Sequence, residues 1–262
     1  MQLFYSKPLL IKALGTKPLS IQSLTIKRLG IATLLLSLLT PLLASAVERP
    51  LPFAATYKAS YNGLNVTAVR TLTALDNGEY ELRFEAKSFI ATIEEFSRFH
   101  WRDRHIVPNR YEYHRVGLGK DRHAVLTFDW KKRKVTNDVQ NKPWTMKLPK
   151  MALDKLSYQL QLSSDLLNKS ADLQYQIADG GSLKEYGFEM QGTEKMNTPM
   201  GSVDAIKIKR IRDTDAKRVT YLWIAPQWNY MLVRLRQQEA DGEHYEINLA
   251  SATLDGQPVQ GN

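Results

Sequence analysis

The segment Phe53–Ala68 has the sequence FAATYKASYNGLNVTA, and it decides the fold class. Apolar or aromatic residues occupy every second position up to Tyr61, with small or polar residues between them. Asn62-Gly63 follows, and Asn-Gly is a strong signal for a tight β-hairpin turn. The alternation then resumes at Leu64. This pattern on both sides of a turn predicts two antiparallel strands, each with one buried and one solvated face.

The same alternation continues far beyond this hairpin. In Glu79–Lys87 four apolar residues alternate with charged ones, and comparable stretches follow with connections of only a few residues. One of these connections is the basic tip Lys131–Lys134. Sequential strands joined by short connections usually pair with their neighbours. The sequence therefore predicts a mainly β protein whose sheet is a curved antiparallel meander, either open or a partial barrel.

One segment, Ala152–Asn168, breaks this alternation. Its leucines recur at helical spacings of three, four and seven residues, which place them on one helix face: Leu153, Leu156, Leu160 and Leu167. Pro149 precedes the segment and Lys169 follows it, as is common at helix ends. We expect one substantial helix here. It should pack against the apolar face of the sheet, because the leucine stripe needs a large apolar surface to cover it.

The first 46 residues are typical of a secretory signal peptide. Five basic and no acidic residues accompany the apolar run Leu29–Leu43, which the small residues Ala44–Ala46 follow. An uncleaved membrane anchor is the alternative, but the run is shorter than the roughly 20 residues that a span needs, and Pro41 interrupts it. We therefore expect cleavage after Ala46, a periplasmic location, and a single β-rich domain over residues 47–262.

Composition excludes several classes of protein. The chain contains no cysteine, so it can have no disulfide, thiolate nucleophile, cysteine-bound zinc or lipidated cysteine. The formal net charge of +9 belongs largely to the signal peptide, because the remainder has 31 basic and 27 acidic residues. A mildly basic exported protein suits an acidic partner such as anionic lipid, and we expect no nucleic-acid partner.

The sequence shows no catalytic motif, and we predict no enzyme activity, cofactor or metal. The Gly-x-Ser-x-Gly nucleophile motif is missing. Asp213–Arg218 and Asp179–Ser182 lack the ligands or the length that calcium and phosphate loops require. Four histidines between His100 and His123 are spaced by five, nine and nine residues, unlike metal ligands on one strand or helix. Three of them could still meet across neighbouring strands: His100, His114 and His123.

Four segments resemble a bacterial family known as domain of unknown function 3108. They are VLTFDWKKRKV at Val125–Val135, DKLSYQLQL at Asp154–Leu162, MGSVDAIKI at Met200–Ile208 and YLWIAPQWNYMLVRLR at Tyr221–Arg236. The resemblance covers most of residues 53–250, although Met231 stands where the family usually has proline. It implies an exported, β-rich envelope protein and no particular activity. The expected architecture is similar to that of periplasmic lipoprotein carriers, which is an analogy of fold alone.

The last long stretch, Thr220–Leu249, is rich in aromatics and is expected to form the closing meander of the sheet. The strand around Trp223 is apolar on both faces, so we expect it to be buried on both sides. Trp228 falls in the turn that follows and is expected to be exposed. In the next strand, Met231, Val233 and Leu235 are expected to face inward together. These two tryptophans, with Leu156 and Leu160 of the helix, are the residues that we expect to bind a ligand.

A basic stripe marks another candidate surface. Arg98, Arg102 and Arg104 share one parity, together with His100. The stripe is either the solvated face of a strand or a docking face for an anionic partner or lipid headgroup. The pattern of residues leaves both interpretations open.

The leading hypothesis is a non-enzymatic periplasmic protein that binds or carries a lipid or other hydrophobic ligand in an apolar groove between helix and sheet. It rests on the surplus of apolar strand faces over a single helix. A lipid or a lipidated protein is then the partner, with peripheral membrane contact. The alternative is an envelope interaction or scaffold protein with a fully packed core and no ligand. The helix and the charged strand faces disfavour an outer-membrane barrel.

Overall fold

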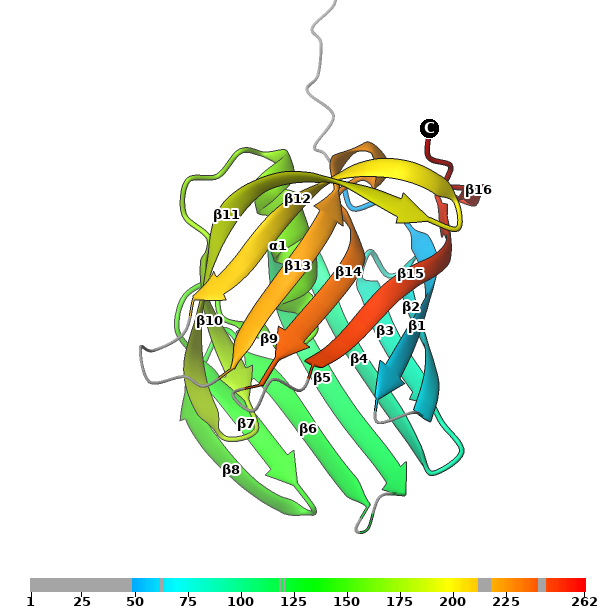
Figure 1. Cartoon of the computed structure of the whole chain (residues 1–262). Coiled ribbons are helices and arrows are strands. Elements are labelled where there is room, and N and C mark those ends of the chain that lie inside the picture. The colour runs from blue at the N-terminus through cyan, green and yellow to red at the C-terminus, as the bar shows by residue number, and fades with distance from the viewer. Residues whose placement is uncertain (1–48, 62–63, 118, 120, 212–217, 240–243) are drawn as a thin grey trace, which may run out of the picture. The chain divides into compact units, whose positions relative to one another are not determined.

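A computed structural model describes residues 49–61, 64–117, 119, 121–211, 218–239 and 244–262 of the chain. In these residues sixteen strands form one curved sheet that curls around one α-helix (Figure 1). The predicted signal peptide, residues 1–46, lies outside the described residues and stays a prediction. No helix in the described part of the chain has the length and apolar character needed to cross a membrane.

The elements follow one another in the order β1 Phe53–Tyr61, β2 Leu64–Ala74, β3 Tyr80–Lys87, β4 Ala91–Arg102, β5 His105–Gly117, β6 Arg122–Asp129, β7 Lys134–Val139, β8 Lys142–Lys147, β9 Leu153–Asp154, α1 Ser157–Leu167, β10 Gln174–Asp179, β11 Ser182–Thr198, β12 Gly201–Ile211, β13 Val219–Ala225, the 3-10 turn η1 Pro226–Trp228, β14 Met231–Gln238, β15 His244–Leu254 and β16 Gln257–Pro258.

The sheet is made of two meanders joined side by side. Neighbouring strands follow the order β8-β7-β6-β5-β4-β3-β2-β1-β15-β14-β13-β12-β11-β10-β9, and β16 pairs with β15. The join is the antiparallel pairing of β1 with β15, which brings the first and last long strands together. The two ends of this order, β8 and β9, are not paired with each other among the described residues. The prediction of a mainly β, open curved sheet with one helix is therefore confirmed.

The helix is shorter than the leucine pattern predicts, because α1 covers Ser157–Leu167 instead of Ala152–Asn168. The residues before it form the short strand β9, which pairs in parallel with β10. The buried Asp154 carboxylate accepts the backbone N–H groups of Leu156 and Ser157 at 2.9 and 2.8 Å. These bonds end the extended segment and satisfy donors at the start of the helix.

Helix α1 packs inside the curve of the sheet, in its upper part in Figure 1. Leu162 and Leu166 of α1 are buried in one core cluster together with inward side chains of the sheet such as Leu126. The Gln161 side chain accepts the backbone N–H of Ile106 at 2.9 Å. The helix is thus held to β5 by both apolar contact and a buried hydrogen bond.

Strand β13 is buried on both faces, as its sequence predicts. Leu222 and Ile224 belong to the core cluster that contains α1. Trp223 and Ala225, on the other parity, belong to a second cluster. Period-two geometry makes this possible, because successive side chains point to opposite faces of a strand.

The second cluster is completed by an arm, defined here as Gly192–Ile206, the far halves of β11 and β12. The pairing of these strands has a bulge between Met190 and Gly192, and in Figure 1 the arm crosses over β13 and β14 toward the C-terminal segment. Backbone hydrogen bonds fasten its tip, including Gly261 N–H to Met200 O at 2.7 Å. Gly201 allows this close approach, because a Cβ atom there would lie 2.9 Å from the Gly261 backbone.

Two side-chain predictions for the closing meander are wrong. Trp228 is 3% exposed, because its indole belongs to the second cluster and its Nε1–H donates to Gln260 O at 3.0 Å. The expected common inward face of Met231, Val233 and Leu235 is also broken. The pairing of β13 with β14 shifts register there, and a β-bulge sets two residues against one. Met231 and Val233 consequently join the second cluster, whereas Leu235 lines the interior.

A candidate ligand cavity below the helix

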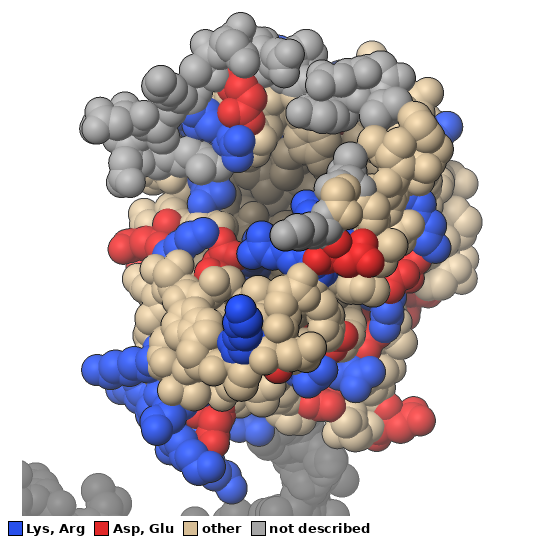
Figure 2. Space-filling view, turned by 90° about the horizontal axis from the view of Figure 1, so that it is seen from below, with Lys and Arg blue, Asp and Glu red and all other residues tan. Residues whose placement is uncertain are grey.

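A cavity of about 610 Å³ lies between the start of α1 and the inner face of the sheet. Strands β1–β4 form one side of it, and β10–β12 with β14 and β15 form the other. Figure 2 views the molecule from this end, where the surface is hollowed and Lys and Arg side chains border the hollow. Pockets for small molecules typically measure about 300–1,000 Å³, so the cavity has room for a ligand.

Part of the lining is apolar. Phe84 lies on β3, Leu232 and Leu235 lie on β14, Ile247 lies on β15, and Leu156 precedes α1. These side chains come from both sides of the cavity and from the helix end. They can surround an apolar chain, and their burial by a ligand would be favourable.

Charged groups also reach the cavity, and Arg70 is the most buried of them. It lies on β2 between its cross-strand neighbours Ala55 and Phe84 and is only 7% exposed. Its Nε is buried and has no hydrogen-bond partner among the described residues. Burial raises the pKa of the Tyr57 hydroxyl. The charge and hydrogen bonding of Arg70 act in the opposite direction and offset this increase only in part. The Tyr57 hydroxyl donates to Leu232 O at 3.0 Å, and the Nε donor of Arg70 stays unused among the described residues.

A second arginine, Arg210 on β12, lines the other side of the cavity. Its guanidinium carbon lies 3.4 Å from the centre of the Tyr186 ring, which is a close cation–π stack. Its Nε is likewise buried without a hydrogen-bond partner among the described residues. Stacking holds the planar group in place and leaves its edge for hydrogen bonding.

Glu95 on β4 is the acidic group nearest to Arg70 in the strand register. Phe84 on β3 lies between them, paired with Arg70 on one side and with Glu95 on the other. It accepts a hydrogen bond from the Tyr111 hydroxyl at 2.6 Å. Burial raises the pKa of Glu95, and the Tyr111 bond and nearby cations only partly offset this. A raised pKa favours the neutral acid and weakens the negative charge in the cavity.

Ion pairs gather near the mouth. Asp179 lies 2.5 Å from Lys184 and 3.8 Å from Lys155, and Arg218 pairs with Glu239 at 2.7 Å. Counting all lining residues, five are basic and two are acidic. A concave surface with this excess attracts negatively charged groups, because low-dielectric walls concentrate the field.

The residues predicted to bind a ligand are only partly brought together. Leu156 lines the cavity. Leu160 and Trp228 line an adjoining small hollow of about 40 Å³ beside the middle of α1, which shares Tyr57, Arg70, Gln159 and Leu232 with the cavity. Trp223 lies outside both, in the second cluster, where its Nε1–H donates to Glu194 at 2.7 Å. Only the helix start therefore lies at the large cavity.

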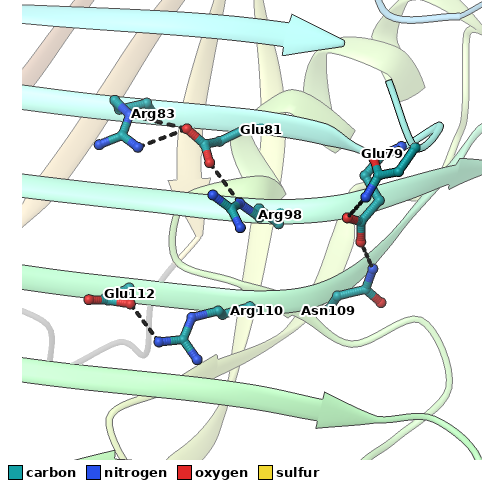
Figure 3. A network of polar contacts seen from close by, with 8 residues as sticks. Glu79, Glu81, Arg83, Arg98, Asn109, Arg110 and Glu112 are labelled. Atoms are coloured by element: carbon teal, nitrogen blue, oxygen red, sulfur yellow. Dashed lines mark hydrogen bonds and ion pairs between the residues drawn. The ribbon is translucent and has the colours of Figure 1, made fainter. Parts of the chain in front are cut away.

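The predicted basic stripe is spread over different surroundings. Figure 3 shows Arg98 within a row of charges on β3–β5, where its Nε donates to Glu81 at 2.7 Å. Burial acts to raise the pKa of Glu81, but the hydrogen bonds and charges of Arg98 and Arg83 outweigh it, so the pKa is lowered overall. Arg102 is exposed at the end of β4, and Arg104 lies in the following turn, where it donates to Asn168 at 3.0 Å. Docking of an anionic partner at this stripe stays a prediction.

The histidines do not assemble a metal site in the described residues. His114 and His123 face each other across β5 and β6 with ring centres 5.6 Å apart. Nε2 of His123 lies 2.9 Å from Glu112, and Nε2 of His100 lies 3.9 Å from Glu79 on another strand pair. Of the three histidines that could have met across neighbouring strands, His114 and His123 do so, but His100 lies on another strand pair.

The sequence analysis did not single out the charged residues of the cavity, although their even or odd position in each strand places them on an apolar face. Arg70 shares its strand face with Ala68 and Leu72, and Arg210 shares its face with Ile208. An arginine at an inward position of an alternating strand must be paired, exposed or functional. This signal is available in the sequence alone.

The chain matches one family model, and a solved β-barrel-like protein agrees with its fold. The model of one family, described as protein of unknown function (DUF3108), matches residues 56–249 and confirms the resemblance. A β-barrel-like protein of domain of unknown function DUF1849 from Brucella abortus has 11% identity and a TM-score of 0.54, covering 79% of this chain and 99% of its own. The Pseudomonas aeruginosa MucA/MucB complex has 10% identity and a TM-score of 0.32, with coverage of 79% and 53%. No curated protein matches the sequence.

Proposed function

Because the chain belongs to the DUF3108 family of unknown function, we propose its role from the site itself. The protein is an exported, non-enzymatic envelope protein that binds a hydrophobic or amphiphilic ligand in the cavity below α1. Export rests on the predicted signal peptide, with cleavage after Ala46 and release into the periplasm. A lipid or a lipidated protein is the class of partner, met at the membrane surface.

The observation that carries the proposal is the cavity of about 610 Å³ with Phe84, Leu232, Leu235 and Ile247 in its lining. Natural cores are close-packed, with few voids larger than a water molecule. A space of this size is therefore more readily understood as a binding site than as a packing defect. It also speaks against the alternative of a scaffold with a fully packed core. The lining is more polar than the apolar groove expected from the sequence, which favours an amphiphile over a hydrocarbon.

Ligand binding is tested with the full chain, exported through its own N-terminal segment and purified without detergent. N-phenylnaphthylamine, a neutral probe that fluoresces in apolar sites, is titrated into the protein. The variant Leu235→Trp fills part of the cavity and should lose most of the fluorescence gain. Val116→Trp places the same side chain at a position on β5 that is 44% exposed and should behave like the wild type.

Two results would count against the proposal. The wild type could fail to enhance the fluorescence and could carry no hydrophobic molecule in native mass spectrometry. Alternatively, Leu235→Trp and Val116→Trp could bind the probe equally well, which would place the probe elsewhere. Location is tested separately: osmotic shock should release the protein, and the sequence of its N-terminus should begin at Val47.

A further inference from the structure

The two arginines that face into the cavity come from different parts of the sheet. Arg70 on β2 and Arg210 on β12 are separated in the sheet order by β1, β15, β14 and β13. Both line the same cavity, and neither belongs to an ion pair within the described residues. Burying a guanidinium group is costly unless an anion and hydrogen bonds compensate it.

Tyr158, in the first turn of α1, lines the same cavity as the two arginines. Its side chain packs edge-to-face on Tyr186, with ring centres 5.2 Å apart. Burial raises the pKa of its hydroxyl, while the charges of both Arg210 and Arg70 act to lower it. Both guanidinium groups are therefore within electrostatic reach of one point in the cavity. A compact anionic group near Tyr158 would interact with both.

The remaining charges of the lining are already engaged. Lys155 and Lys184 pair with Asp179, and Arg218 pairs with Glu239. Glu95 is the acid nearest to Arg70 in the strand register, and its hydrogen bond from Tyr111 directs one carboxyl oxygen to β5. The buried Nε donors of the two arginines remain for a ligand.

We propose that the cavity selects an anionic amphiphile, whose carboxylate or phosphate headgroup is held by Arg70 and Arg210. The apolar chain lies along Phe84, Leu232, Leu235 and Ile247. Arginine suits this task because its planar fork forms two hydrogen bonds to either oxyanion. The inference rests on the proposed function and adds the sign of the ligand's charge to it.

The test compares four ligands with chains of about twelve carbons: dodecanoate, dodecyl phosphate, dodecanol and dodecyltrimethylammonium. Each displaces N-phenylnaphthylamine from the full chain, below its micelle concentration and at fixed salt. Hydrogen bonds to charged groups are the stronger kind, so the two anions should bind about 10- to 100-fold more tightly than dodecanol. The cation should bind most weakly. The ratio of dodecanoate to dodecyl phosphate affinity tells whether a carboxylate or a phosphate headgroup is preferred.

Three variants locate the effect. Arg70→Met and Arg210→Met should each reduce anion binding by about tenfold or more and leave dodecanol binding unchanged. Arg110→Met removes the same charge from the outer face, where Arg110 pairs with Glu112, and should change neither. Retained binding of dodecanol shows that a variant is folded, so loss of anion binding in Arg210→Met is informative even if Arg70→Met does not fold.

The outcomes separate this inference from the proposed function. Equal affinity for dodecanol and the anions, or equal anion loss in Arg110→Met and the cavity variants, would overturn the headgroup site while ligand binding stands. No displacement by any of the four ligands, with no probe binding, would overturn the proposed function itself.

Discussion

Replacing Asp154 tests how the chain passes from β9 into α1. Its carboxylate accepts three hydrogen bonds: from the Ser97 hydroxyl at 2.6 Å and from the N–H groups of Leu156 and Ser157 at 2.9 and 2.8 Å. The residue is completely buried, so water cannot replace these bonds. At about 1 kcal/mol for each bond, Asp154→Ala should lower the free energy of unfolding by about 3 kcal/mol.

Asp154→Asn should be much milder. Burial raises the pKa of Asp154, against the hydrogen bonds from Ser97 and from the helix start, so removing the negative charge costs less here than it would at the surface. The amide oxygen can keep both backbone N–H groups, and the Ser97 hydroxyl can turn to accept from the amide nitrogen. We expect a loss of about 1 kcal/mol or less.

Urea unfolding followed by tryptophan fluorescence measures both changes. With a slope near 2–3 kcal/mol/M, the midpoint of Asp154→Ala should fall by about 1 M. Asp76→Ala, at an exposed turn position, is the matched control and should stay within about 0.5 kcal/mol of the wild type. If Asp154→Asn lowers the free energy of unfolding as much as Asp154→Ala does, the hydrogen bonds from backbone N–H groups to this side chain do not explain where the helix begins.

Two further predictions concern other parts of the sheet. Gly181→Ala should cost about 1–3 kcal/mol in urea unfolding, because φ is +115° and the new Cβ would lie 2.2 Å from the Trp144 ring; Gly78→Ala, with positive φ but open space, should cost less. Burial raises the pKa of Glu95 above its usual 4.5, so its contribution to stability is present at low pH and is lost as the pH rises through the folded value. Glu95→Gln should therefore flatten the pH profile of unfolding above 4.5, and a profile parallel to the wild type would contradict this.

Much of the fold could be predicted from local pattern. The hairpin of Phe53–Ala68 forms with the expected register, in which Tyr61 pairs with Leu64 and Phe53 with Leu72. Period two and a tight turn determine such a pair without information from elsewhere in the chain. The pairing of β1 with β15 could not be found in this way. Those strands lie far apart in sequence, and no local signal specifies which distant edges meet.

The wrong predictions share a physical origin in contacts between distant segments. Trp228 occupies a turn, where exposure is usual, but the second cluster and the Gln260 carbonyl enclose it. The bulge in the pairing of β13 with β14 shifts Val233 and Leu235 into different surroundings. A leucine spacing of three and four residues also fits Leu153, which lies in a strand. Periodicity alone cannot resolve these cases.

Arg70 and Arg210 are different, because the alternation in the sequence alone places their side chains on inward strand faces. Arg70 interrupts the apolar face of β2, Arg210 follows Ile206 and Ile208 on one face of β12, and the structure places both arginines at the cavity. Arg70 is buried and Arg210 is partly buried, and a guanidinium group removed from water costs stability without a compensating anion, so arginines on inward faces indicate a polar interior site. Charged residues at inward-facing strand positions are a better guide to the site than the aromatic residues, which mostly pack in the core.

The cavity itself follows from the lengths of the elements. Helix α1 has 11 residues and spans about 16 Å, whereas β5 has 13 residues and spans about 43 Å. One helix therefore covers less than half the length of the sheet that curls around it. Leu162 and Leu166 pack the upper half, and the cavity lies in the lower half. Because α1 begins at Ser157, five residues later than the leucine pattern predicts, the space below Leu156 is larger than the sequence alone indicated.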